Sequence, residues 1–134
     1  MIILACMLFL FFYILQDKAL AAQAENATTL GEAMMCEGVY DQKPVNPTIV
    51  FPVSKKNAFC FTDFPMVKEK SYIYHKWYRR DRLITKIKLE VLPPRWSVYS
   101  NISFREVDKG PWRIDITDSN DDLLKTLRFS VTDE

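Results

Sequence analysis

Residues 71–91 read SYIYHKWYRRDRLITKIKLEV, and this stretch decides the fold class. Side chains alternate between two faces along residues 71–79 and again along residues 83–91. The first run carries large side chains on both faces: Ile73, His75 and Trp77 on one, and Tyr72, Tyr74 and Tyr78 on the other. From residue 85 on, the second run alternates strictly between uncharged and charged residues, and this period of two is typical of a half-buried strand. The charged residues 80–82 separate the two runs and predict a tight turn, so the stretch is predicted to form a β-hairpin.

The rest of the chain after residue 36 follows the same pattern in both directions from this hairpin. Runs rich in β-branched and aromatic residues are separated, about every 8–12 residues, by clusters of turn-forming residues. Residues 41–48 contain two prolines and are predicted to be a loop, whereas residues 49–51 and 58–64 are predicted strands. No long helix is predicted. The pattern predicts an all-β domain, an antiparallel Ig-like β-sandwich of about seven or eight strands.

The N-terminal residues have a different composition. Residues 2–15 are apolar without interruption, which is short of the about 20 residues that span a bilayer and suits the core of a signal peptide. Small residues follow at Ala19-Leu20-Ala21 and at Ala22-Gln23-Ala24, where a signal peptidase could cut. No Lys or Arg precedes the apolar run, so an uncleaved anchor helix stays open as an alternative. We therefore expect residues 1–24 to be a signal peptide or anchor, residues 25–33 a linker, and residues 34–134 one β-sandwich domain.

Two cysteines remain after the predicted leader, Cys36 and Cys60. An even number of cysteines in an exported chain predicts a disulfide, which would stabilise a domain of this size by about 3 kcal/mol. Two separate buried thiols are the alternative. The single histidine, His75, makes a zinc site with four ligands hard to assemble, so no metal is predicted.

The overall charge gives little information about partners. The formal net charge is +1, which gives no argument for a nucleic acid or a membrane surface as a partner. The export signal argues further against nucleic acid. We expect contact with a membrane only through the N-terminal segment, if it is not cleaved.

Several short motifs follow one another in a characteristic order. They are Cys36; Cys60-Phe61-Thr62; Tyr74-His75-Lys76-Trp77-Tyr78; Arg95-Trp96-Ser97 with Ser100; Gly110-Pro111-Trp112-Arg113-Ile114; and Leu124 with Phe129-Ser130-Val131. This ordered set resembles the bacterial domain of unknown function numbered 2914, over about residues 34–132. The resemblance implies an exported or membrane-tethered β-domain and implies no activity.

Cations and tyrosines concentrate on the hairpin. The candidate ligand-binding residues are Tyr74, His75, Lys76, Tyr78, Arg79, Lys86 and Lys88. Aromatic rings stack on sugars while Lys and Arg pair with carboxylates or phosphates, so the set could hold an anionic glycan. A solvated face whose lysines protect a sheet edge from aggregation is the alternative.

Other residues that could carry chemistry have simpler interpretations. His75 is either a buried core histidine or a catalytic base, and no nucleophile elbow, phosphate loop or metal-ligand pair accompanies it. We therefore predict no catalytic residue and no cofactor. Asp118, Asn120 and Asp122 match the opening of a calcium loop, but Leu123 stands where that loop needs glycine, so a hairpin turn is predicted.

The large apolar residues of the second half are predicted to form the core. They are Trp77, Trp96, Trp112, Ile114 and Phe129. Exposed tryptophans that form a carbohydrate platform are the alternative.

Three function classes remain from the sequence. The first is a non-catalytic binding or interaction module of the cell envelope, whose partner is an anionic glycan or an envelope protein. The second is a structural or accessory domain of an envelope assembly. The third, with least support, is an enzyme that uses His75. The expected location is periplasmic or secreted, or anchored at the membrane by the N-terminal segment.

Overall fold

The computed structural model describes residues 28–134, so the predicted leader lies outside the described residues. The described residues form nine strands and two single-turn 3-10 helices, η1 (Val53–Lys55) and η2 (Glu106–Asp108). The strands are β1 (Ala33–Tyr40), β2 (Lys43–Pro47), β3 (Val50–Pro52), β4 (Asn57–Phe64), β5 (Ser71–Arg79), β6 (Arg82–Val91), β7 (Trp96–Ser103), β8 (Gly110–Thr117) and β9 (Leu123–Thr132). Within residues 28–134, no helix has the length and apolar character that crossing a bilayer requires.

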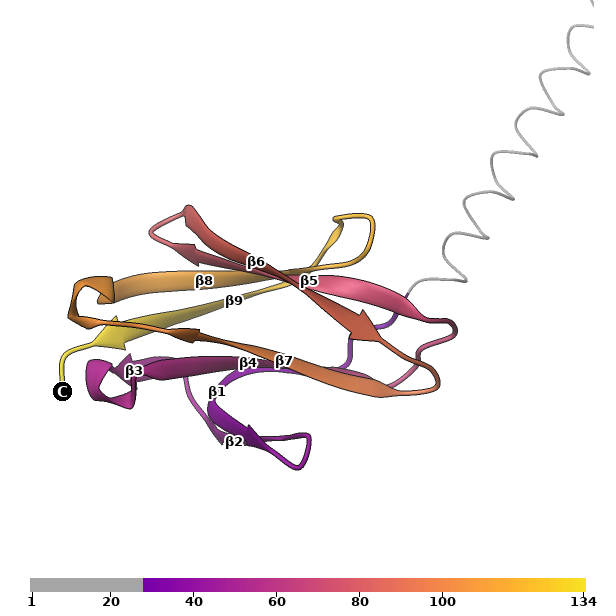
Figure 1. Cartoon of the computed structure of the whole chain (residues 1–134), viewed down its shortest axis with the longest axis horizontal. Helices are drawn as coiled ribbons and strands as arrows, with labels where there is room; N and C mark the ends of the chain where they lie inside the picture. Colours follow the sequence, from indigo (N-terminus) through magenta and orange to yellow (C-terminus); the bar gives the residue numbers. More distant parts are fainter. Residues whose placement is uncertain (1–27) are drawn as a thin grey trace, which may run out of the picture.

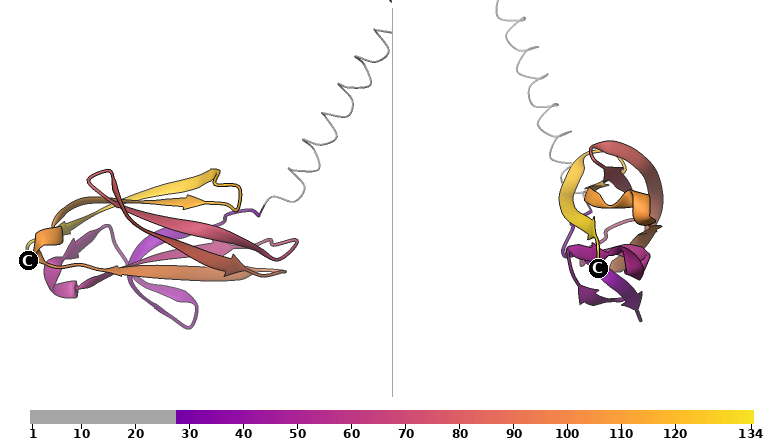
Figure 2. Two further views of the ribbon diagram at one scale, coloured as in Figure 1. Left: turned by 45° about the horizontal axis from the view of Figure 1, so that its top comes forward. Right: turned by 90° about the vertical axis from the view of Figure 1, so that its left-hand side faces the viewer.

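The strands form two sheets that pack face to face (Figure 1). The four-stranded sheet has the order β2-β1-β4-β7, and the five-stranded sheet has the order β3-β9-β8-β5-β6. Figure 2 shows the two sheets as stacked layers when the molecule is viewed from its end. The predicted all-β sandwich is confirmed, and all strand pairs are antiparallel except β3 with β9.

The hairpin that decided the fold class forms as predicted. β5 and β6 pair in antiparallel register, with Lys76 opposite Lys86 and Tyr74 opposite Lys88. Arg80 and Asp81 connect them with positive φ angles of 47° and 63°, the conformation of a type I′ turn. The right-handed twist of the strands favours this turn, although neither residue is glycine.

The strand count exceeds the predicted number because residues 43–47 form β2 instead of a loop. Asp41 and Gln42 have positive φ angles of 49° and 56° and close a second tight hairpin between β1 and β2. Pro44 and Pro47 read as loop residues in the sequence because proline cannot donate to a neighbouring strand. β2 lies at the edge of its sheet, where the missing donors are tolerated.

Part of the predicted linker is attached to the sandwich. Gly31 donates its backbone N–H to the Asp63 carbonyl over 2.8 Å, and Asp63 donates its own to the Glu32 carbonyl over 2.8 Å. Thr29 forms a bridge to Met66. The described residues of the linker therefore add to the end of β4.

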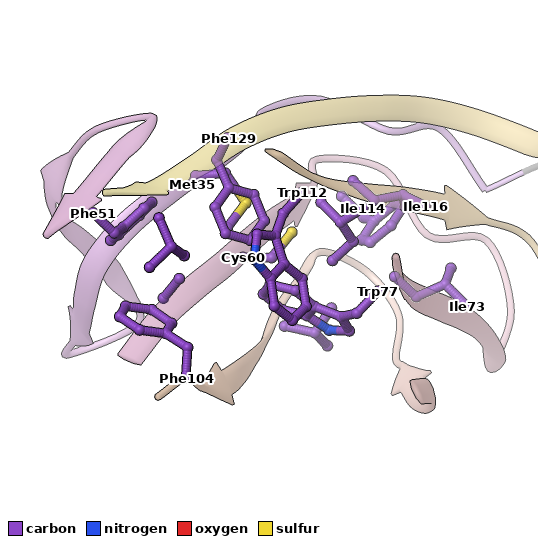
Figure 3. Packing of buried hydrophobic residues seen from close by; sticks show 14 of the residues in the cluster. Met35, Phe51, Cys60, Ile73, Trp77, Phe104, Trp112, Ile114, Ile116 and Phe129 are labelled. Carbon is purple, nitrogen blue, oxygen red and sulfur yellow. The ribbon is translucent and has the colours of Figure 1, made fainter. Parts of the chain in front are cut away.

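The core lies between the sheets and is rich in aromatic rings (Figure 3). Phe129 stacks on Trp112 with ring centroids 5.9 Å apart, and it makes a T-shaped contact with Trp77, also with centroids 5.9 Å apart. Ile114 is also fully buried. Trp96 differs from the other predicted core residues, because it is only half-buried and packs against the margin of the cluster.

The predicted disulfide between Cys36 and Cys60 is absent, and both residues are buried free thiols. Cys36 lies opposite Phe59, and Cys60 lies opposite Met35, in the β1–β4 register. Directly opposite residues project to the same face and successive residues to opposite faces. The two side chains therefore leave the sheet on opposite sides, with Cys60 in the core. The structure agrees with the alternative prediction, two separate buried thiols.

The free thiols can be tested by mass spectrometry. We expect peptides containing Cys36 and Cys60 from the full-length chain, alkylated after unfolding without reductant, each to carry one alkyl group. In the folded chain both thiols should resist the reagent, because neither is exposed to solvent. A peptide pair cross-linked through these two sulfurs would contradict the β1–β4 register.

The central aromatic cluster predicts the cost of a large deletion. Trp112→Ala should lower the free energy of unfolding by about 3–5 kcal/mol, because it removes a buried ring that stacks on Phe129. Trp96→Ala is the matched control and should cost about 1–2 kcal/mol, because that ring is only half-buried. Urea denaturation of both variants measures the difference, and equal losses would be inconsistent with this core.

Candidate functional site

The candidate binding residues divide between the two faces of β5 and β6. Tyr74, Lys76, Tyr78, Lys86 and Lys88 share the outer face of the five-stranded sheet. His75 and Arg79 belong to the other alternation and point toward the four-stranded sheet or its end. The structure thus brings five of the seven residues together.

On the outer face, cationic side chains lie over tyrosine rings. Lys86 Nζ lies 4.0 Å from the centroid of the Tyr74 ring, and Lys88 Nζ lies 4.0 Å from that of Tyr72. Each lysine is the diagonal cross-strand neighbour of its tyrosine, a position within reach of long side chains in an antiparallel pair. A cation at this distance is attracted to the ring face.

A third cation–aromatic pair has its cation on a different strand, β8. Arg113 on β8 lies directly opposite Tyr78, and its Cζ is 4.1 Å from the ring centroid. We name the whole surface the cation–aromatic face. Its members are Tyr72, Tyr74, Lys76, Tyr78, Lys86, Lys88 and Arg113.

Sequence reasoning missed two members of this face. Tyr72 follows the same alternation as Tyr74 and could have been included on that signal. Arg113 could not, because its place over Tyr78 depends on the pairing of β5 with β8.

The cations of this face differ in their ionic partners. Lys76 forms an ion pair with Asp121, and Arg113 pairs with Asp81 and, at 3.2 Å, with Asp115. Within residues 28–134, neither Lys86 nor Lys88 has a carboxylate oxygen within 4.0 Å of its Nζ. Both are exposed. These two amines are therefore available to an external anion.

An open depression continues the face at one end of the hairpin. It has a volume of about 550 Å³ and is lined by Lys70, Ser71, Tyr72, Lys88 and Glu90. Lys70 Nζ and Glu90 Oε2 pair across it at 3.4 Å. Both side chains are more than half exposed, so the pair contributes little to stability.

His75 sits inside the sandwich and links the two sheets through hydrogen bonds. Its Nδ1 is 2.7 Å from Ser100 Oγ, and its Nε2 is 3.3 Å from Thr62 Oγ1. The Thr62 hydroxyl donates to the Val98 carbonyl, so it accepts from Nε2–H. The Ser100 hydroxyl then donates to Nδ1 and accepts from Trp77 Nε1–H at 3.1 Å.

Every polar group in this network has a partner when the imidazole is neutral. Burial lowers the pKa of His75 to about 3. Within residues 28–134, the hydrogen-bond partners of the ring are two hydroxyls, and neither is a carboxylate. A neutral, solvent-excluded imidazole of this kind holds the sheets together and does not reach a ligand on the surface.

Arg79 is held at the end of the sandwich. Its Nη1 donates to Asp108 Oδ1 over 3.1 Å, and its Nη2 donates to the Val107 carbonyl over 2.6 Å. Trp112 Nε1 donates to the Asp108 carbonyl over 2.8 Å. Arg79 therefore anchors η2 to β5 and is not part of the cation–aromatic face.

The segment that resembled a calcium loop is the turn between β8 and β9. Asp118 Oδ1 accepts the backbone N–H groups of Asn120 and Asp122, each over 2.9 Å. The Asp118 carboxylate thus accepts backbone N–H groups of the turn in place of a backbone carbonyl, as in an Asx-turn. Within the described part of the chain, no group of three or more His, Cys, Asp or Glu residues could hold a metal ion.

Comparison with known protein families identifies the part of the chain that carries this face. Residues 70–131 match the family model described as protein of unknown function (DUF2914). This match confirms the resemblance inferred from the ordered motifs, over a shorter range than residues 34–132. It begins one residue before β5 and ends within β9, so it includes the cation–aromatic face and excludes both buried cysteines. No curated protein matches the chain.

The buried histidine predicts how stability depends on pH. The unfolded chain binds a proton at His75 with a pKa near 6.5, whereas the folded chain does so only near 3. The unfolded state therefore binds more protons as the pH falls below 6.5, and the folded state loses stability down to about pH 3. Between pH 7 and pH 5 the free energy of unfolding should fall by about 2 kcal/mol.

Urea titrations at pH 7, 6 and 5 measure this slope, and His75→Gln should flatten it. The imidazole shifts of the folded wild-type chain, observed by NMR, should remain those of a neutral ring at pH 5. A charged His75 in the folded chain at that pH would contradict the buried network, whatever the stability of the variant.

Proposed function

We propose that the chain is a non-catalytic binding module of the cell envelope that takes an anionic glycan on its cation–aromatic face. One observation carries this proposal. Lys86 and Lys88 stand exposed on the outer face of β6, each over a tyrosine ring and, within residues 28–134, without a carboxylate partner. Two adjacent unneutralised amines on a rigid sheet form a surface that attracts anions.

The contacts define how such a ligand would bind. One face of the Tyr72 ring and one face of the Tyr74 ring are each occupied by an amine at 4.0 Å, so a sugar ring does not stack on those faces without displacing a lysine. The anionic groups of the ligand therefore pair with the amines first. Residues two apart on a strand are about 7 Å apart along it, which suits the repeated charges of a polymer better than one small ion.

The position of His75 favours binding over catalysis in this proposal. The chain has one histidine, and its ring nitrogens bond to Ser100 and Thr62 inside the sandwich. The proposal therefore assigns no catalytic residue. It places the domain outside the cytoplasm, released or anchored by residues 1–24, on the strength of the apolar run in residues 2–15.

A structural role in an envelope assembly is the second candidate, and the edge position of β6 favours it. β6 has ten residues, lies at the edge of the five-stranded sheet and exposes about half of Leu83 and Ile84. A strand of another protein could add to such an edge. Lys86 and Lys88 would then serve to keep unrelated strands away.

The two roles make different predictions for charge reversal. Lys86→Glu with Lys88→Glu should weaken binding to polygalacturonate and to dextran sulfate by at least about tenfold at low salt, because two attractive charges become repulsive. The melting temperature should change little, because both side chains are exposed. Isothermal titration calorimetry with the full-length chain measures the affinity, and uncharged dextran serves as the blank.

Lys43→Glu with Lys56→Glu is the matched control. These two lysines are exposed and lie outside the face, and their reversal changes the net charge by the same amount. The control should retain most of the affinity. Unchanged binding by the Lys86 and Lys88 variant, or no binding by the wild-type chain, would rule out this site and leave the structural role.

A further inference from the structure

The turn between β8 and β9 places a carboxylate on the cation–aromatic face. Asp121 pairs with Lys76 Nζ, and Thr117 Oγ1 lies 3.4 Å from the same carboxylate oxygen, Oδ1. In Figure 1 this turn curls away from the four-stranded sheet, on the side that bears the outer face. Asp121 is thus an internal anion at the surface where we propose that an external one binds.

Two lysines of the outer face act on the Asp121 carboxylate, Lys76 by direct contact and Lys86 through its charge. Lys76 and Lys86 lie directly opposite each other on β5 and β6 and project to the same outer face. Like charges in this arrangement repel, so an anion between them is stabilising. Lys76 is nearest to Asp121, and the Lys86 charge acts on the same carboxylate and helps to lower its pKa.

The turn keeps its shape without the Asp121 carboxylate. Asp118 Oδ1 accepts the N–H groups of Asn120 and Asp122, and the backbone N–H of Asp121 donates to the Asp118 carbonyl over 3.0 Å. Asp121 itself has a positive φ of 67°, a conformation that Asp and Asn tolerate. The side chain of Asp121 is 59% exposed, whereas that of Lys76 is 15% exposed. The carboxylate can therefore leave Lys76 while the turn stays folded.

We infer that Lys76 and Lys86 form an anion subsite, and that Asp121 occupies it as an intramolecular competitor of the ligand. This inference rests on the proposed function and extends the site from Lys86 and Lys88, which have no carboxylate partner within residues 28–134, to Lys76. The competing group is a carboxylate or sulfate of the glycan, which exchanges with the Asp121 carboxylate on the Lys76 amine. No bond forms or breaks covalently in this exchange.

Removing the competitor should strengthen binding. Asp121→Asn should raise the affinity for polygalacturonate about two- to fivefold, the size expected from one partly exposed ion pair. Asn retains the side-chain shape and tolerates the positive φ, so the variant should melt at nearly the wild-type temperature. Titration calorimetry on the full-length chain at fixed salt measures the change.

Asp122→Asn is the matched control, because it removes the same charge from the same turn. Within residues 28–134, the Asp122 carboxylate has no ion-pair partner. Asp122→Asn should change the affinity for polygalacturonate much less than Asp121→Asn does, because only the net charge changes. An equal gain in both variants would show an effect of net charge alone and overturn the inference, as would no gain, or a loss, in Asp121→Asn.

A second change separates this inference from the proposed function. Lys76→Met should abolish the gain that Asp121→Asn produces, because both residues act at one subsite, whereas Lys86→Glu with Lys88→Glu should weaken binding in either background. If the double reversal weakens binding and Asp121→Asn has no effect, the proposed function stands and the competitor is refuted. If neither the wild-type chain nor Asp121→Asn binds the polymers, both fail.

Discussion

A hydrogen-bonded chain of four side chains joins the two sheets at the centre of the domain. Thr62 on β4 and Ser100 on β7 reach across to His75 and Trp77 on β5. With a neutral imidazole every polar group of this network has a partner, and a buried polar group without one costs about 1–3 kcal/mol. These bonds specify how the sheets are placed relative to each other, around rings that would otherwise pack in several ways.

The outer face depends on this inner network through the alternation of β5. Because His75 and Trp77 must point inward, Tyr74, Lys76 and Tyr78 must point outward. β6 then adds Lys86 and Lys88, and β8 adds Arg113 opposite Tyr78. The core and the candidate binding surface are therefore two sides of the same strand, and a slip of one residue would destroy both.

Some cations of this surface are paired with carboxylates of the described residues and others are not, and in our proposal the unpaired ones bind the ligand. Arg113 is neutralised by Asp81 and Asp115, and Lys76 by Asp121. Within residues 28–134, Lys86 and Lys88 have no carboxylate partner and lie over aromatic rings, which attract a cation without cancelling its charge. Tyrosines thus hold the two amines in place and leave them able to pair with an external anion.

Sequence patterning predicted most of the strands but read residues 43–47, which form β2, as a loop. Alternation along residues 83–91 and the charged turn at residues 80–82 are local properties, so they predicted the hairpin, whereas both faces of residues 71–79 carry large side chains and left the inward face of that strand to the fold. The pairing of strands beyond such hairpins could not be predicted, because their register joins residues far apart in the chain. That is why Cys36 and Cys60 came to lie on opposite faces of one sheet, and why Asp121, 45 residues beyond Lys76, came to neutralise it.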